Sequence, residues 1–270
     1  MTRIVASVTP ASAHWDHLTA LVIDLAAGQA YDVSSTTHES ALAVVSGHVE
    51  VKGSGLDHVI VRPSPFTTLA DVVYLPPGAP VSISAREDSQ ITIGQAPASG
   101  RFDPRVVATG EMESVIRGGG PARRQVVSTL ADPIPAERLI MYEGWVARGS
   151  WTGWPPHRHD GVDGSPRLEE TYYFRFDRSS GFGFHRNFAP EDHWDETHTL
   201  HDQSLVAVPR GYHLCAAGPA ANMWLLNFLA GPESDRDRAP HFDPAETWIN
   251  EDWGAGLLTL PAVLGHRHDA

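Results

Sequence analysis

The sequence predicts an all-β protein made of two tandem β-barrels or sandwiches, and three observations lead to this fold class. Short runs of β-branched and aliphatic residues recur along the chain, separated by Gly, Pro and Asp. No long stretch shows the 3.6-residue periodicity of an amphipathic helix. A strand-like run that ends in a Pro-x-Gly turn occurs once in each half, at residues 73–78 and 206–211. We interpret this echo as an internal duplication.

The expected strands can be named in chain order. Each run is rich in Val, Ile or Leu and is bounded by turn-forming residues, which is typical of a short strand in a barrel or sandwich. The runs are Leu21–Leu25, Ala41–Val51, Val72–Gly78, Ile91–Ile93 and Leu205–Val208. Between the halves, Pro135–Ile140 is expected to form one helical turn at most.

The stretch of residues 117–124 predicts where the two halves join. It reads Arg-Gly-Gly-Gly-Pro-Ala-Arg-Arg and offers no large apolar side chain to a core. We therefore expect an N-terminal domain over residues 1–120 and a C-terminal domain over residues 121–270. The first half has no His-x-His and no His after its Pro-Pro-Gly turn. The metal and the active site are therefore expected in the second domain.

Composition narrows the class of function. The 270 residues carry a net charge of −13, which argues against nucleic acid or a membrane surface as a partner. Lys52 is the only lysine, so the His-rich half cannot form a Schiff base with substrate or pyridoxal phosphate. Cys215 is the only cysteine, which fits a reducing compartment. No segment reaches the length of an apolar membrane span, and we expect a cytoplasmic protein.

The most informative motif joins three histidines and a glutamate. His157 and His159 are two residues apart, so on a strand their side chains point to the same face. A Glu pair follows at Glu169 and Glu170, and His213 comes after the second Pro-x-Gly turn. Three imidazoles with one carboxylate suit a first-row divalent ion, with Zn or Mn expected from the ligand types. The order of these residues is that of a cupin metal site.

Further segments carry a resemblance to a known family. They are Pro155-Pro156-His157-Arg158-His159-Asp160, Leu168-Glu169-Glu170-Thr171-Tyr172-Tyr173, Gly181-Phe182-Gly183-Phe184-His185-Arg186, Trp194-Asp195-Glu196-Thr197, Val208-Pro209-Arg210-Gly211-Tyr212-His213 and Leu226-Asn227-Phe228-Leu229-Ala230-Gly231-Pro232. With them the chain resembles the 5-deoxy-glucuronate isomerase family of bacterial myo-inositol catabolism. That family is related to 4-deoxy-L-threo-5-hexosulose-uronate ketol-isomerase. The resemblance covers essentially the whole chain.

The resemblance implies a bicupin fold and an aldose–ketose isomerisation of 5-deoxy-D-glucuronate to 5-dehydro-2-deoxy-D-gluconate, aided by one divalent metal ion. Three departures from the family pattern bear on substrate contacts. Arg158 stands where the family usually has Lys, the segment from His185 to Phe188 differs, and Leu214 replaces a Pro.

Candidate roles follow for individual residues. For the carboxylate ligand we prefer Glu170 to Glu169, because its spacing to Tyr173 fits the usual cupin Glu-x-x-Tyr strand, and adjacent strand residues face opposite sides. A planar arginine is the natural clamp for the substrate carboxylate. The remaining candidates are Arg186 and then Arg175 for that clamp, Glu169 as a further catalytic residue, His185 and His201 as bases, and Tyr172, Tyr173 and Tyr212 for sugar hydroxyls.

Two readings of other classes stay open at this point. The chain could be a non-catalytic sugar-binding cupin, although no helix-turn-helix module stands at either end. The same ligand shell could also hold Fe(II) in a cupin dioxygenase. Isomerisation consumes no oxygen, so oxygen uptake distinguishes the dioxygenase. Assembly into a homo-oligomer is possible, and no sequence feature fixes its size.

Overall fold

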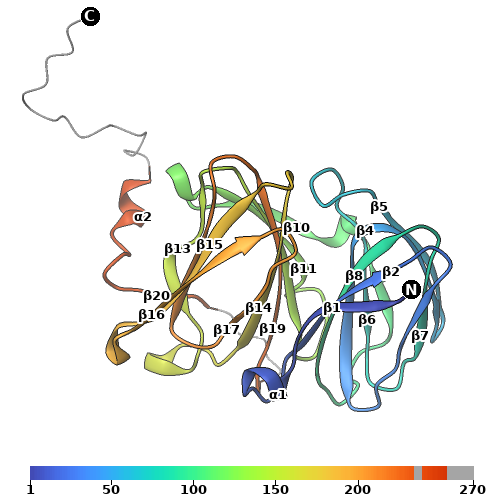
Figure 1. Cartoon of the computed structure of the whole chain (residues 1–270). Coiled ribbons are helices and arrows are strands. Elements are labelled where there is room, and N and C mark those ends of the chain that lie inside the picture. Colours follow the sequence, from blue (N-terminus) through green and yellow to red (C-terminus); the bar gives the residue numbers. More distant parts are fainter. Residues whose placement is uncertain (234–238, 254–270) are drawn as a thin grey trace, which may run out of the picture.

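The computed structural model describes residues 1–233 and 239–253, and β-strands dominate them (Figure 1). In these residues the α-helices are α1 (Pro10–Ala13) and α2 (Ile249–Asp252), of four residues each. The predicted all-β class is confirmed. No helix in residues 1–233 and 239–253 has the length and apolar character needed to span a membrane.

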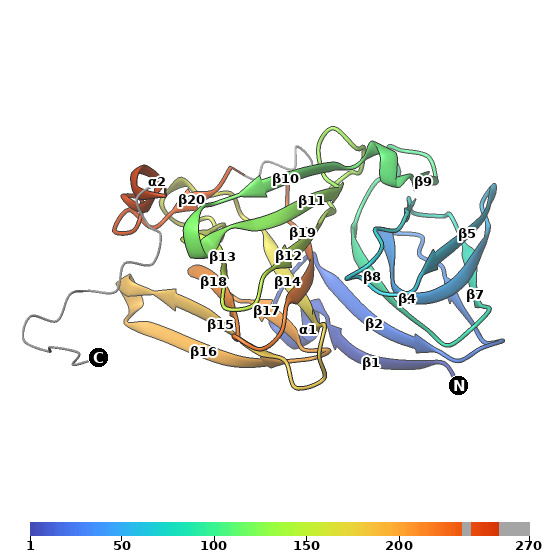
Figure 2. The ribbon, with the colours of Figure 1, turned by 90° about the horizontal axis from the view of Figure 1, so that it is seen from above.

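The N-terminal strands form one nine-stranded sheet that curls around a common interior (Figure 2). The long strand β4 bends it, because its first part pairs with β6 and β8 and its second part with β5 and β7. Buried aliphatic residues such as Val44, Val49 and Ile83 fill the interior. The strands are β1 (Arg3–Val8), β2 (Thr19–Leu25), β3 (Ala30–Val33), β4 (His38–Gly53), β5 (Leu56–Arg62), β6 (Val72–Leu75), β7 (Val81–Ala85), β8 (Ser89–Pro97) and β9 (Arg105–Val107).

The later strands form two further sheets that pack face to face. Phe174 and Leu225 from one sheet and Leu200 and Cys215 from the other share a single buried cluster. The six-stranded sheet contains β10 (Glu113–Arg117), β11 (Arg124–Leu130), β12 (Ile140–Val146), β19 (Met223–Ala230), β14 (Glu169–Phe176) and β17 (Leu205–Val208). The five-stranded sheet contains β16 (Trp194–His201), β15 (Phe182–Ala189), β18 (Tyr212–Ala217), β13 (Trp151–Arg158) and β20 (His241–Phe242).

The strands expected from the sequence are present, and two connections differ from expectation. The glycine-rich stretch 117–124 joins β10 to β11 within one sheet, so the chain passes to the second group of strands before it, between β9 and β10. No helical turn forms at Pro135–Ile140. Instead, the backbone N–H groups of Glu137, Arg138 and Leu139 donate to the carboxylate of Glu39. A buried acceptor from the first half has thus replaced helical hydrogen bonding.

The two groups of strands share a core. One buried cluster combines Ala41 and Val72 from the first group with Leu130 and Phe228 from the second. Beside it, the fully buried Arg62 donates two hydrogen bonds to Glu143 on β12, and Trp224 Nε1 donates to the same carboxylate at 2.8 Å. A buried ion pair with this many partners fixes how the two groups sit against each other.

Candidate metal centre

Two neighbouring strands of the five-stranded sheet bring three histidines together. His157 near the end of β13 is the register partner of His213 on β18, and their ring centroids are 4.4 Å apart. His159 follows β13 directly, and its ring centroid lies 5.1 Å from that of His213. Nitrogen atoms of all three rings approach within 4.8 Å of one another. The His-x-His spacing and the later His thus meet at one point, as the sequence predicts.

Glu170 reaches this point from the opposite sheet. Its Oε2 lies 2.8 Å from His159 Nε2 and 3.1 Å from His213 Nε2. Glu169 directly precedes Glu170 on β14 but faces away from the histidines. Its carboxylate accepts the backbone N–H groups of Asp16, His17 and Leu18 at 2.7–2.9 Å. The structure therefore brings Glu170, and not Glu169, to the histidine cluster.

The arrangement of donors fits a divalent metal ion. His159 Nδ1 lies 2.9 Å from the Leu168 carbonyl oxygen, which can only accept, so Nδ1 carries the proton. His159 Nε2 then faces the Glu170 carboxylate oxygen, as two ligands of one ion would. Adjacent ligands of one first-row ion at about 2.1 Å lie about 3 Å apart, which agrees with both separations at Glu170. The Asn227 side-chain amide donates to the other Glu170 oxygen and orients it.

His185 supports the cluster from one side. It is fully buried on β15, and its ring stacks on His213 with a centroid distance of 6.1 Å. Its two ring nitrogens contact Cys215 Sγ at 3.0 Å and Asn187 Oδ1 at 3.1 Å. Burial, and then the neighbouring His213, lower the pKa of His185 to about 3, so the ring is neutral at physiological pH. With both nitrogens engaged, His185 is placed to position His213 rather than to act as the base.

Three other predicted site residues lie away from the histidines. Arg186 alternates to the outer face of β15, where its guanidinium binds Asp195 at 2.9 and 2.6 Å. His201 is exposed at the end of β16. Tyr212 precedes His213 and so faces the other side of β18, where the Arg158 guanidinium lies 4.9 Å from its ring centroid.

Arg175 and the remaining tyrosines can be placed as well. Arg175 binds Asp202 and Gln90, and Tyr173 donates to Gln90 at 2.6 Å, so both side chains turn toward the N-terminal sheet. Tyr172 is the predicted tyrosine that reaches the histidines, with its Oη 3.4 Å from His213 Nε2. Neither arginine that the sequence offered as a carboxylate clamp lies at the cluster.

Two cavities adjoin the cluster, and both are lined by Arg117, Arg124 and His157. The larger one has a volume of about 200 Å³ and also reaches His159 and Trp154. The smaller one, of about 90 Å³, lies on the side of Tyr172. The sequence reading missed both arginines because it treated residues 117–124 as a linker. Two arginines flanking a Gly-Gly-Gly-Pro turn were the signal that could have revealed them.

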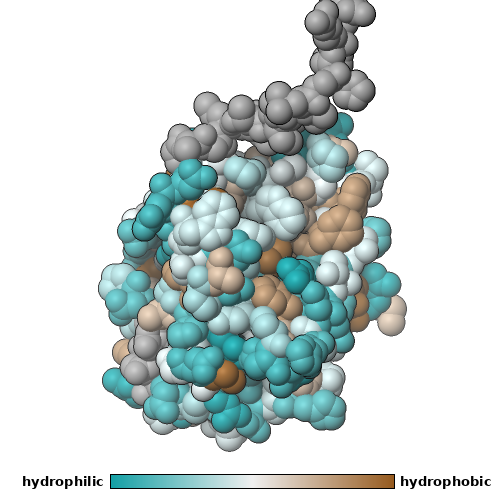
Figure 3. All heavy atoms as spheres, turned by 90° about the vertical axis from the view of Figure 1, so that its left-hand side faces the viewer, coloured by the Kyte–Doolittle hydropathy of each residue, from teal (hydrophilic) through white to brown (hydrophobic). Residues whose placement is uncertain are grey.

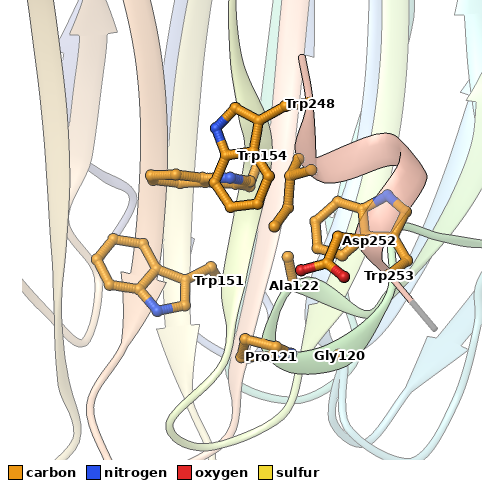
Figure 4. Close-up of a pocket in the computed structure, with 9 residues that line it drawn as sticks. Gly120, Pro121, Ala122, Trp151, Trp154, Trp248, Asp252 and Trp253 are labelled. Atoms are coloured by element: carbon orange, nitrogen blue, oxygen red, sulfur yellow. The ribbon is translucent and has the colours of Figure 1, made fainter. Parts of the chain in front are cut away.

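An apolar pocket of about 310 Å³ borders the larger cavity and shares Trp154 and Trp253 with it. Figure 4 shows the indole rings of Trp151, Trp154, Trp248 and Trp253 arranged around the turn at residues 120–122. On the side of the molecule that carries α2, hydrophobic residues lie among hydrophilic ones (Figure 3). No histidine of residues 1–233 and 239–253 lines this pocket, which lies beside the candidate metal centre.

Comparisons with known proteins agree with this architecture. 5-Deoxy-glucuronate isomerase of Geobacillus kaustophilus is 31% identical over 253 residues, which cover 92% of this chain and 91% of that protein. The enzyme of the same name from Bacillus subtilis strain 168 is 30% identical over 256 residues, covering 92% and 93%.

Solved structures extend the comparison. The crystal structure of an IolB-like protein from Salmonella typhimurium LT2 superposes with a TM-score of 0.87 at 30% identity and covers 92% of this chain and 95% of that one. Oxalate decarboxylase of Bacillus subtilis, a cupin-type protein, shares the fold at 14% identity with a TM-score of 0.62, covering 90% and 77%. The model of the KduI/IolB family matches residues 1–249. The chain therefore belongs to the KduI/IolB family.

Proposed function

We propose that this protein is a metal-dependent aldose–ketose isomerase that converts 5-deoxy-D-glucuronate to 5-dehydro-2-deoxy-D-gluconate in myo-inositol catabolism. The relatives that share 28–31% of its residues bear the name of this isomerase. The single observation that carries the proposal is the convergence of His157, His159, His213 and Glu170 beside cavities sized for a small molecule.

We also propose that the fold is a bicupin, with a first unit expected over residues 1–120 and a second over 121–270. Two strands support the internal repeat, since β6 and β17 each lead into a Pro-x-Gly turn whose glycine has a positive φ, 80° at Gly78 and 71° at Gly211. The pairing of β10 with β11 supports a second unit that starts a few residues earlier than expected, at residue 113. Cys215 is the only cysteine, and it is buried as a free thiol, which fits a cytoplasmic location.

The chemistry requires two transfers. One hydrogen moves between the two carbons of the carbonyl and its neighbour, and one proton moves between their oxygens. A divalent ion, zinc or manganese, held by the three histidines and Glu170 would supply a Lewis acid that stabilises negative charge on those oxygens. Tyr172 Oη lies beside His213 and can exchange a proton with a substrate oxygen. His185 holds the His213 ring by stacking and excludes water from its far side.

An assay of metal-loaded protein with 5-deoxy-D-glucuronate tests this function. We expect the ketose product to form without oxygen uptake and to be lost in His157→Ala. The same preparation of the variant should show a circular dichroism spectrum unchanged from that of the wild type. Oxygen loss together with an oxidised product in place of the ketose would instead identify a dioxygenase. A metal-loaded wild type that makes no ketose would contradict the proposal and favour a sugar-binding protein.

A further inference from the structure

Arg117 and Arg124 are direct neighbours across the β10–β11 ladder. The register pairs the last residue of β10 with the first residue of β11, at the end of the hairpin nearest the histidines. Like charges placed directly opposite each other destabilise a sheet. Both side chains line the two cavities that contain His157. The pair therefore concentrates positive charge at the metal centre of a chain whose net charge is −13.

Neither guanidinium is neutralised within residues 1–233 and 239–253. The structure shows no ion pair between these two arginines and any carboxylate of that part of the chain. Glu143, the carboxylate among the described residues that line the smaller cavity, is already engaged by Arg62 and Trp224. Burial, and then the charge of Arg117, lower the pKa of Arg124 to about 10, which leaves it charged at neutral pH.

The Arg124 head group is fixed but not saturated. Its Nη1 donates to the carbonyl oxygens of Ala122 at 3.2 Å and Trp154 at 3.3 Å. Its Nε is sealed from solvent and has no acceptor among the described residues. A guanidinium offers five N–H donors in a planar fork, so donors remain for a ligand. A half-buried cation whose donors are incompletely satisfied is stabilised when an anion binds it.

The turn next to Arg124 is shaped to admit its side chain. Gly118 has a φ of +67°, and a Cβ there would lie 2.7 Å from Arg124 Nη1 and 2.4 Å from the Ala122 carbonyl oxygen. Only glycine fits this backbone conformation and this approach. The connection between β10 and β11 therefore packs closely against the Arg124 guanidinium. A flexible linker would make no such contact.

We propose that Arg124, together with Arg117 at the cavity mouth, binds the carboxylate of a sugar acid whose carbonyl end lies at the histidine cluster. This inference rests on the proposed isomerase function and names the part of the site that selects a uronate. Arginine matches a carboxylate with two parallel hydrogen bonds. The same role was expected of Arg186 or Arg175, but their guanidinium groups are engaged by Asp195 and Asp202 away from the cluster.

Isothermal titration of the metal-loaded full chain with D-glucuronate and with D-glucose tests the proposal, because the two sugars differ in the carboxylate. We expect the wild type to prefer glucuronate. Arg124→Gln should weaken glucuronate binding by about 30-fold or more while glucose binding stays unchanged, since truncating one partner of a buried charged pair removes most of its contribution. Arg124→Lys should restore part of the loss, and Arg117→Gln should weaken glucuronate by about 5-fold because Arg117 is exposed.

Arg123→Gln is the matched control. Arg123 is adjacent in sequence, is exposed and lines neither cavity, so the same change of charge should leave both affinities unchanged. Equal loss of glucuronate and glucose binding in Arg124→Gln, or a wild type without preference for glucuronate, would overturn the proposal. Failure of the proposed function has a different signature, in which the glucuronate preference persists but 5-deoxy-D-glucuronate yields no ketose. Melting temperature and metal content of each variant show that it is folded.

Discussion

Glu169 and Glu170 are neighbours in the chain, yet the alternation of side chains along β14 sends them to opposite faces of one sheet. Glu170 is fully buried against His159 and His213. Glu169 caps three backbone N–H groups of residues 16–18, which connect α1 to β2. One carboxylate is thus placed for metal binding and the other for stability, and the two roles can be separated by experiment.

Glu170→Gln should lower metal affinity by at least about 100-fold and abolish isomerase activity, because an amide replaces the anionic ligand. Glu169→Gln should keep its metal but lose about 1–3 kcal/mol in free energy of unfolding, since charged acceptors of N–H groups contribute that much. Metal content by atomic emission and urea denaturation measure the two effects. Equal metal content in both variants would contradict the assignment.

The sequence could place the candidate metal site at residue resolution because its signals are local. His157 and His159 share a face by strand periodicity, and the Pro-x-Gly turn fixes the approach of His213. The position of Arg186 could not be predicted, because its family segment indicates an arginine but not the face of β15 on which it lies. Asp195, its partner, is nine residues away on β16 and binds it on the outer face.

At the scale of elements, the turn between β17 and β18 controls where His213 lies. Gly211 has a φ of +71°, and a Cβ there would lie 2.3 Å from the Phe188 carbonyl oxygen. Its N–H donates to Asp160 at 2.7 Å, which ties the turn to the residue after His159. The turn therefore helps to set the distance between His159 and His213.

Gly211→Ala should cost about 2–4 kcal/mol in free energy of unfolding, because an unfavourable φ is combined with a backbone clash. It should also reduce the bound metal. Gly149→Ala is the control. Gly149 has a similar φ of +75°, and no atom lies within 4 Å of a Cβ added there. This substitution should therefore lower the free energy of unfolding only by the cost of the unfavourable φ, about 1 kcal/mol. Thermal unfolding with and without added metal measures both, and full metal retention in Gly211→Ala would refute the role of this turn.

Strands were predictable and connections were not. A run such as Ala41–Val51 has the β-branched residues of a strand whatever it pairs with, and β4 does span it. The glycine-rich stretch 117–124 has the composition of a linker as well as that of a tight hairpin turn. Which of the two forms depends on whether the flanking residues pair, and the pairing of Arg117 with Arg124 is set by the sheet and not by the stretch itself.

At the scale of the whole molecule, carboxylates from one group of strands bind donors in the other. Glu39 on β4 accepts the N–H groups of residues 137–139, about a hundred positions later in the chain. Glu137 in turn accepts the N–H groups of Ser99, Gly100 and Arg101 after β8. Such partners have no signature in local sequence, and this is why the relative placement of the two halves was not predictable.

Glu137 makes this docking sensitive to acid. Burial raises the pKa of its carboxyl group, but the hydrogen bonds from residues 99–101 outweigh burial, so the pKa lies below its ordinary value. A carboxylate with a lowered pKa in the folded state adds stability that is fully present above the unfolded pKa of about 4.3. This contribution disappears as the pH falls through the folded pKa.

Glu137→Gln should therefore lower the melting temperature by roughly 4–8 °C at neutral pH, the equivalent of about 2 kcal/mol. The difference from the wild type should stay constant between about pH 6 and 8 and narrow below about pH 4.5. Differential scanning calorimetry across this range is the measurement. Because the substitution lies between the two groups of strands and away from the histidines, the metal content should not change. A difference in melting temperature between the wild type and Glu137→Gln that is as large at pH 4 as at pH 7 would contradict this prediction. It would show that the negative charge of Glu137 does not contribute to the contact between the two halves.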